Sequence, residues 1–207
     1  HASHNEQQVA HGIISGVQRI QEALNNNNKG TKIQVHVVTK IWYTYLGYDR
    51  TKIAVDEILN DLKEAMQHPN IDLKIHLLLH WPQCYDHIAW MDCEREEREL
   101  PPHVQSAGSP PHLDRPNAWK EAWRALEDIY DADSNNKKTK AQFSAIASIV
   151  VSNFEQHHIQ DMIESARILP HLTQITAWMN INNPGLVDLY RQHHIHVQLY
   201  NAMTGFV

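Results

Sequence analysis

The stretch LKIHLLLHWP, residues 73–82, decides the fold. It is the most hydrophobic strand-length segment of the 207-residue chain, and it ends in a histidine followed by a Trp-Pro pair. Strands with apolar residues on both faces are typical of parallel sheets that helices cover on both sides. Pro82 cannot donate to a sheet ladder, so the strand should end near His80. The stretch therefore predicts a buried parallel strand, and it raises the question of why an imidazole stands at its end.

Similar segments alternate along the rest of the chain. Strand-like runs cover residues 32–42, 72–80, 143–154, 172–179 and 195–203. Helical stripes, with apolar residues three and four positions apart, cover residues 5–24, 51–66, 117–131, 155–168 and 184–194. Five strands that alternate with helices predict the α/β class. We interpret residues 1–207 as a single domain.

Two architectures share this alternation, an open doubly wound sheet and a (β/α)8 barrel. No Gly-x-Gly-x-x-Gly motif follows any strand, which weakens the dinucleotide-binding form of the open sheet and favours the barrel. The irregular residues 82–116 are expected to form one long loop. Asp114 and Pro116 resemble the cap and first-turn proline of the helix at 117–131, and the polar residues 131–140 are expected to end that helix.

Composition narrows the class of partner. The formal net charge is −6 and the sequence pI is near 6.2, so a basic surface for nucleic acid or for an anionic membrane is not expected. No apolar run approaches the roughly 20 residues of a membrane span, and the first residues do not form a signal-peptide pattern. Cys84 and Cys93, two cysteines in a polar loop, do not make the disulfide framework of a secreted protein. These features favour a cytoplasmic location.

A metal site is a further class to consider, because the loop at 82–116 is rich in possible ligands. These are Cys84, His87, Cys93, His103 and His112. Their spacing differs from the tight pairs that are typical of zinc sites, so we predict no metal site. The charged run CEREERE, residues 93–99, is typical of a solvated helix face.

Polar side chains gather at the predicted carboxyl ends of the strands. They are Lys40, His80, Ser152, Asn153, Gln174, Tyr200 and Asn201. In either α/β architecture these ends meet at one rim, where ligands bind. Taken singly, Ser152 and Asn153 could cap a helix, and Tyr200 could belong to the core. Their joint placement instead predicts one polar site on apolar strands.

At this point the chain resembles the aldo-keto reductases. The motifs TKIW, HWP and VSNF, at residues 39–42, 80–82 and 151–154, follow in the family's order on successive strands. The segments LTQIT and VQLYNAMTG extend the resemblance over essentially the whole chain. It implies a (β/α)8 barrel that binds NADP(H) and transfers a hydride between nicotinamide and the carbon of a small aldehyde, ketone or alcohol.

The resemblance also implies residue roles. Lys40 and His80 match the active-site lysine and histidine, and Trp42 and Trp81 match apolar walls of the substrate pocket. The family's histidine orients the substrate carbonyl, which would explain an imidazole at the end of an apolar strand.

The remaining matches concern the cofactor. Ser152, Asn153 and Gln174 match residues that hold the nicotinamide carboxamide, and Tyr200 matches the ring stacked under the nicotinamide. Asn201 stands where the family usually has a serine near the pyrophosphate.

The family's proton-donating tyrosine is replaced by Ser3. A phenol has a pKa of about 10 and can be tuned towards neutrality, whereas an aliphatic alcohol is a far weaker acid. The first strands and the segment after the seventh strand are also not represented, so we expect a partial barrel of about five strands, truncated at both ends, with open edges that favour self-association. Two functions remain open: a reductase of this type, or an impaired or inactive relative that serves as a binding or scaffold protein.

Overall fold

The structure is a computed structural model that describes residues 5–23, 32–85, 87–113, 117–138 and 145–203. Its centre is one sheet of five parallel strands in the order β1-β2-β3-β4-β5. The strands are β1 Ile33–Ile41, β2 Ile71–Leu79, β3 Ile146–Ser152, β4 Leu172–Thr176 and β5 His196–Tyr200. This order confirms the predicted alternation.

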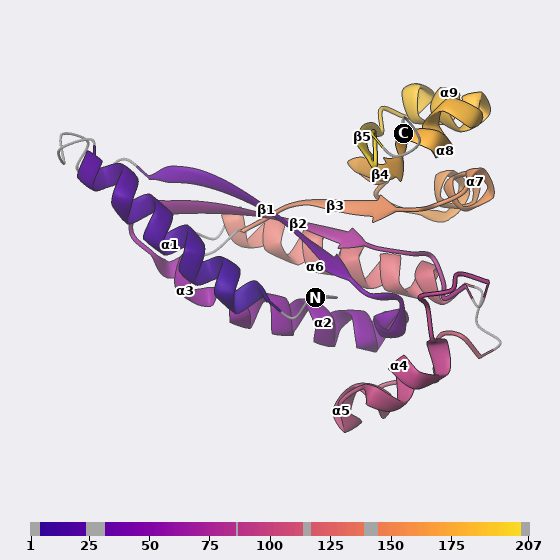
Figure 1. Cartoon of the computed structure of the whole chain (residues 1–207), viewed down its shortest axis with the longest axis horizontal. Helices are drawn as coiled ribbons and strands as arrows, with labels where there is room; N and C mark the ends of the chain where they lie inside the picture. The colour runs from indigo at the N-terminus through magenta and orange to yellow at the C-terminus, as the bar shows by residue number, and fades with distance from the viewer. Residues whose placement is uncertain (1–4, 24–31, 86, 114–116, 139–144, 204–207) are drawn as a thin grey trace.

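Helices follow the strands along the chain, as a (β/α) repeat requires (Figure 1). The longer helices are α1 Glu6–Ala23, α2 Tyr48–Asp61, α6 Ala118–Lys138, α7 Gln156–Ser165 and α9 Pro184–Gln192. The shorter ones are η1 Tyr43–Tyr45, α3 Lys63–Gln67, α4 Cys93–Glu99, α5 Pro102–Gln105 and α8 Ala177–Asn182.

The two faces of the sheet differ in burial. In β2 the side chains of Ile75 and Leu77 are fully buried in the core that the helices complete. On the opposite face of β1, Gln34, His36 and Val38 are exposed, although this face would line the interior of a closed barrel. The five strands therefore form about half of a (β/α)8 barrel, with its inner face open.

The inner face carries polar pairs towards the amino ends of the strands. The Nδ1 atom of His36 lies 2.9 Å from Nε2 of His76, and Nδ1 of His76 lies 2.7 Å from the hydroxyl of Ser148. Burial is the main cause that lowers the pKa of His76, and electrostatic interaction with the neighbouring imidazoles of His36 and His171 adds to it. This histidine pair is separate from the carboxyl rim of the sheet, where His80 stands.

Two predicted boundaries are wrong. Helix α6 continues to Lys138 through the polar residues that we expected to end it, because Ser, Asn and Asp each cost only part of a kcal/mol in a helix and the stretch contains neither Gly nor Pro. Strand β4 ends at Thr176, whose hydroxyl accepts a hydrogen bond of 3.0 Å from the N–H of Met179 and so caps α8. The predicted cap residues Asp114 and Pro116 lie outside the described residues.

The stretch that we predicted to be one long loop contains helices α4 and α5. We call the described part of this stretch, residues 82–85 and 87–113, the excursion. Arg50 of α2 anchors the excursion, because its guanidinium forms two hydrogen bonds of 2.8 Å to the carboxylate of Glu97 in α4. It also donates to the carbonyl oxygens of Thr44, Gln105 and Gly108, and its side chain is only 1% exposed. A single buried cation thus ties the excursion to the barrel.

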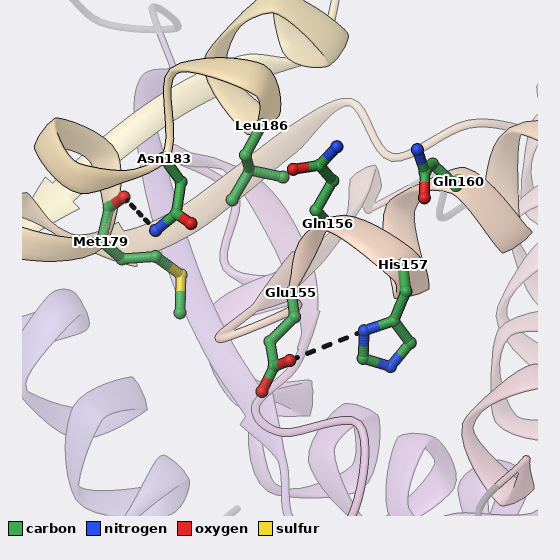
Figure 2. A pocket seen from close by; sticks show the side chains of 7 residues that line it. All are labelled: Glu155, Gln156, His157, Gln160, Met179, Asn183 and Leu186. Atoms are coloured by element: carbon green, nitrogen blue, oxygen red, sulfur yellow. Dashed lines mark hydrogen bonds and ion pairs between the residues drawn. The ribbon is translucent and has the colours of Figure 1, made fainter.

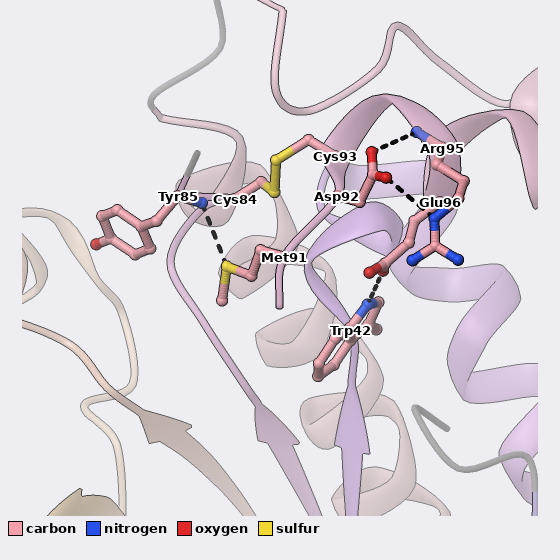
Figure 3. Close-up of a disulfide and its surroundings, with 8 residues drawn as sticks. All are labelled: Trp42, Cys84, Tyr85, Met91, Asp92, Cys93, Arg95 and Glu96. Atoms are coloured by element: carbon pink, nitrogen blue, oxygen red, sulfur yellow. Dashed lines mark hydrogen bonds and ion pairs between the residues drawn. A yellow bond between two sulfur atoms is a disulfide. The ribbon is translucent and has the colours of Figure 1, made fainter. Parts of the chain in front are cut away.

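Cys84 and Cys93 form a disulfide within the excursion (Figure 3). The sequence analysis used these cysteines, which do not make the disulfide framework of a secreted protein, to favour a cytoplasmic location. The structure corrects this use of them, because the two cysteines are bonded to each other. Among the described helices, none combines the length and apolar character needed to cross a membrane.

Candidate functional site

Lys40 and His80 lie at the same rim of the sheet. Lys40 stands near the end of β1, opposite Leu78 in the parallel register. The backbone N–H of His80 donates a hydrogen bond of 3.0 Å to the carbonyl oxygen of Ile41. The two residues therefore follow neighbouring strands at their carboxyl ends, as the sequence analysis expected.

His80 is held in its neutral form. Burial and the nearby charge of Lys40 lower the pKa of His80 to about 3. Burial also lowers the pKa of Lys40. The Nδ1 atom of His80 is buried and has no hydrogen-bond partner among the described residues. Near neutral pH the site thus combines an uncharged imidazole with a lysine.

Asn153 connects three strand ends. Its side-chain N–H donates a hydrogen bond of 2.9 Å to the carbonyl oxygen of His80, and its side-chain oxygen accepts one of 2.5 Å from the hydroxyl of Tyr200. Its φ of 60° lies in the left-handed region, where Asn is tolerated better than most residues. The chain therefore turns sharply after β3 and presents the amide between β2 and β5.

Ser152 and Gln174 join the same rim from β3 and β4. The hydroxyl of Ser152 donates a hydrogen bond of 2.8 Å to the carbonyl oxygen of Gln174, and the Gln174 amide donates one of 3.0 Å to the side chain of Gln198. Ser152 is fully buried, whereas Asn201 is exposed. Burial raises the pKa of the half-buried Tyr200. The strands thus place Lys40, Ser152, Gln174 and Tyr200 towards the carboxyl ends of the sheet.

Aromatic rings flank His80. The ring centroid of Trp42 lies 5.0 Å from that of His80, and the centroid of Trp81 lies 6.1 Å away. The indole N–H of Trp42 donates a hydrogen bond of 2.5 Å to the carboxylate of Glu96 in α4 (Figure 3). Trp90 lies 5.9 Å from both other indoles. Sequence reasoning missed Trp90 and Glu96, because they lie in the stretch predicted to be irregular.

A separate pocket of about 490 Å³ lies beside the helices that follow β3 and β4 (Figure 2). Its lining residues are Glu155, Gln156, His157, Gln160, Met179, Asn183 and Leu186. None of the predicted site residues lines it. Within the described part of the chain, no three His, Cys, Asp or Glu side chains are grouped so as to hold a metal ion.

Comparison with known proteins supports the resemblance. No protein-family model matches the chain. The NADPH-dependent aldose reductase of Saccharomyces cerevisiae is 25% identical over 202 residues, which is 96% of this chain and 52% of that protein. The NADPH-dependent D-xylose reductase of Meyerozyma guilliermondii is 24% identical over 198 residues, again 96% of this chain and 52% of that protein.

The fold agrees with these relatives. The solved structure of aldose reductase from Giardia lamblia matches 99% of this chain and 56% of its own, with a TM-score of 0.59 and 18% identity. The chain is therefore similar in sequence to these two reductases and in fold to an aldose reductase, and it spans about half the length of the relatives that it matches.

Proposed function

We propose that this chain carries the carboxyl-rim site of an NADP(H)-dependent reductase, in one domain that acts on small aldehydes or ketones. The observation that carries the proposal is the connected set formed by His80, Asn153 and Tyr200, with Lys40 beside it. Two relatives are named as NADPH-dependent reductases of sugars, which supports this class of cofactor and substrate. A cytoplasmic location remains part of the proposal on the other sequence features alone, because the paired cysteines no longer support it.

The residues present fit the nicotinamide end of the cofactor. Tyr200 offers a half-buried aromatic ring at the rim, and the amides of Asn153 and Gln174 offer both donors and acceptors there. The side-chain oxygen of Asn153, which accepts from Tyr200, can accept a second hydrogen bond. Ser152 would contribute through the acceptor capacity of its hydroxyl, and the exposed Asn201 would lie nearest the pyrophosphate. Bound NADPH would supply a hydride to the carbonyl carbon.

The chain's own residues would orient the substrate and stabilise its charge. A neutral imidazole at His80 can donate one hydrogen bond to a carbonyl oxygen. The ammonium of Lys40 favours the negative charge that develops on this oxygen. Trp42 and Trp81 would form apolar walls that exclude water from the reacting carbonyl. We assign the donation of the final proton to none of these residues. The family's proton donor is a tyrosine, and its position is occupied by Ser3, which lies outside the described residues.

The second candidate function is an impaired or inactive relative that binds ligands without turnover. Ser3 favours it, because an aliphatic hydroxyl is too weak an acid to replace a tuned phenol. Both functions require cofactor binding at the rim. Only the reductase transfers hydride, so the two are separated by product analysis after cofactor binding has been established.

We expect Tyr200→Ala to weaken NADPH binding several-fold, because alanine removes the aromatic surface available for stacking, which is commonly worth on the order of 1 kcal/mol. Tyr200→Phe keeps the ring and removes only the hydroxyl, which donates a hydrogen bond to Asn153. This variant should therefore retain most of the affinity for NADPH. Titration of NADPH, followed by quenching of tryptophan fluorescence, measures both variants. An affinity that is unchanged in Tyr200→Ala would place the cofactor elsewhere.

We also expect the isolated chain to self-associate. Strands β1 and β5 lie at the two edges of the described sheet, and unpaired edges can pair with other chains. Near β5, Val197, Leu199, Trp178 and Ile181 are exposed apolar side chains, 38%, 45%, 75% and 71% exposed respectively. Light scattering after size exclusion should show a mass that rises with concentration, and Leu199→Lys should reduce this rise. A constant monomer mass at high concentration would contradict the prediction.

A further inference from the structure

A pocket of about 340 Å³ lies between helices α6 and α7, and none of the rim residues lines it. Its inner wall is apolar: Trp119 and Trp123 of α6 and Met162 of α7 line it, and each is at most 2% exposed. Pockets that bind small molecules typically measure roughly 300–1,000 Å³ and combine an apolar lining with a few polar groups. The pocket between α6 and α7 therefore has room for a small ligand with an apolar body.

Charged side chains surround this apolar wall, and most of them are paired within the chain. The ammonium of Lys120 lies 2.6 Å from the carboxylate of Asp161. The guanidinium of Arg167 pairs with three carboxylates, which are those of Glu127, Asp128 and Asp131. Both cations are thus committed to acidic partners of the protein itself.

Arg124 is the exception among the cations that line the pocket. Its guanidinium lies over the ring of Tyr48, 4.8 Å from the ring centroid, and no ion pair or hydrogen bond joins it to another described residue. The hydroxyl of Tyr48 donates a hydrogen bond of 2.8 Å to Asp128, which holds the ring in place. A guanidinium that lies over a ring uses its face, so the N–H groups in its plane remain available to both oxygens of a carboxylate.

We propose that this pocket binds a small monocarboxylate with an aliphatic chain, whose carboxylate pairs with Arg124 and whose chain lies against Trp123 and Met162. The unpaired guanidinium selects a negative head group. A thioether side chain adapts its shape to a flexible chain, which favours an aliphatic body. Glu127 also lines the pocket and is buried, so it would repel a second carboxylate and thereby exclude dicarboxylates. The inference goes beyond the proposed reductase function and does not rest on it.

The test measures binding of octanoate to the unmodified chain by isothermal titration calorimetry, with three matched ligands. Burial of one methylene group typically raises affinity about fourfold, so acetate should bind at least about tenfold more weakly than octanoate. Octanamide keeps the chain and lacks the charge, and it should bind about three- to fivefold more weakly, the range of an exposed ion pair. Octanedioate carries a second carboxylate and should also bind more weakly than octanoate.

Three variants locate the site. Arg124→Gln should raise the Kd for octanoate about three- to fivefold and abolish the preference for octanoate over octanamide. Arg191→Gln is the matched control, because Arg191 is an exposed arginine of α9 that does not line the pocket, and it should leave the Kd unchanged. Ala166→Leu places a larger side chain in the lining while Arg124 is kept, and it should raise the Kd at least about tenfold.

The comparison of octanoate with octanamide uses only the unmodified chain, so it does not depend on how any variant folds. Equal affinities for these two ligands, or no binding of octanoate at millimolar concentration, would show that the inference is wrong. Octanoate binding that persists unchanged in both Arg124→Gln and Ala166→Leu would place the ligand on another apolar surface and would also overturn it. None of these variants alters a rim residue, so failure here leaves the proposed reductase function untouched.

Discussion

Arg50→Ala should lower the free energy of unfolding by about 3–5 kcal/mol, the usual cost of removing one partner from a buried ion pair. The Arg50 side chain is 1% exposed, and its guanidinium donates hydrogen bonds to the carboxylate of Glu97 and to three backbone carbonyl oxygens. Alanine would leave the buried carbonyl oxygen of Thr44 and the partly buried carboxylate of Glu97 without this donor, so the excursion containing α4 and α5 should detach first. Urea unfolding, followed by far-ultraviolet circular dichroism and tryptophan fluorescence, measures the loss.

A matched variant separates burial from charge. Arg95 in α4 also pairs with carboxylates, Asp92 and Glu99, but its side chain is 54% exposed. Exposed pairs contribute little because water screens them. Arg95→Ala should therefore change the unfolding midpoint only slightly. If both variants were equally stable, Arg50 would not be the anchor of the excursion.

Arg50 also shows a limit of sequence reasoning. In the sequence it stands directly before the helical stripe predicted at residues 51–66, where an arginine is normally solvated. Its partner Glu97 lies in a charged run that we interpreted as a solvated helix face. Nothing local distinguishes a buried arginine from a surface one. Its role depends on α4 folding back over α2, which is a tertiary contact.

The second large effect concerns His80. We expect His80→Ala to reduce the rate of aldehyde reduction by about 10² to 10³, the typical cost of removing one hydrogen-bond donor to a developing oxyanion. The neutral imidazole lies next to Lys40 and can donate to a carbonyl oxygen, and alanine would leave its place to water. His80→Gln should recover part of the rate, because an amide can also donate. NADPH oxidation with 4-nitrobenzaldehyde measures these rates.

The rim residues could be predicted because they depend on local patterns. A strand in a parallel sheet is an apolar run, and the first polar residue after it marks the rim, so Lys40, His80 and Asn153 could be placed from the sequence. Their mutual contacts could not be placed. The bridge from His80 through Asn153 to Tyr200 spans residues far apart in the chain and depends on the strands pairing side by side in chain order.

The excursion after β2 was the least predictable part. Its proline pairs indicate irregular structure, and only the charged run at 93–99 was interpreted as a helix face, which is where α4 lies. The structure also has a second helix, a disulfide and the side chain of Trp90 beside Trp42. Cysteine spacing alone does not reveal pairing, since a bridge depends on whether two Cα atoms come close enough in the fold. Here the start of α4 returns to the end of β2, and the cysteines meet.

The central claim is that a hydride passes from NADPH to a carbonyl carbon at the rim around His80. The most direct measurement incubates the chain with 4-nitrobenzaldehyde and NADPH that carries deuterium at the transferable position, and then analyses the alcohol by mass spectrometry, which detects slow turnover. His76→Ala is the matched control, because His76 stands on the same face of β2 four residues earlier, towards the other end of the strand. The account predicts a deuterated alcohol that persists in His76→Ala and is reduced about 10² to 10³-fold in His80→Ala. An equal yield of deuterated alcohol from His80→Ala, or its absence from the unmodified chain, would contradict the claim.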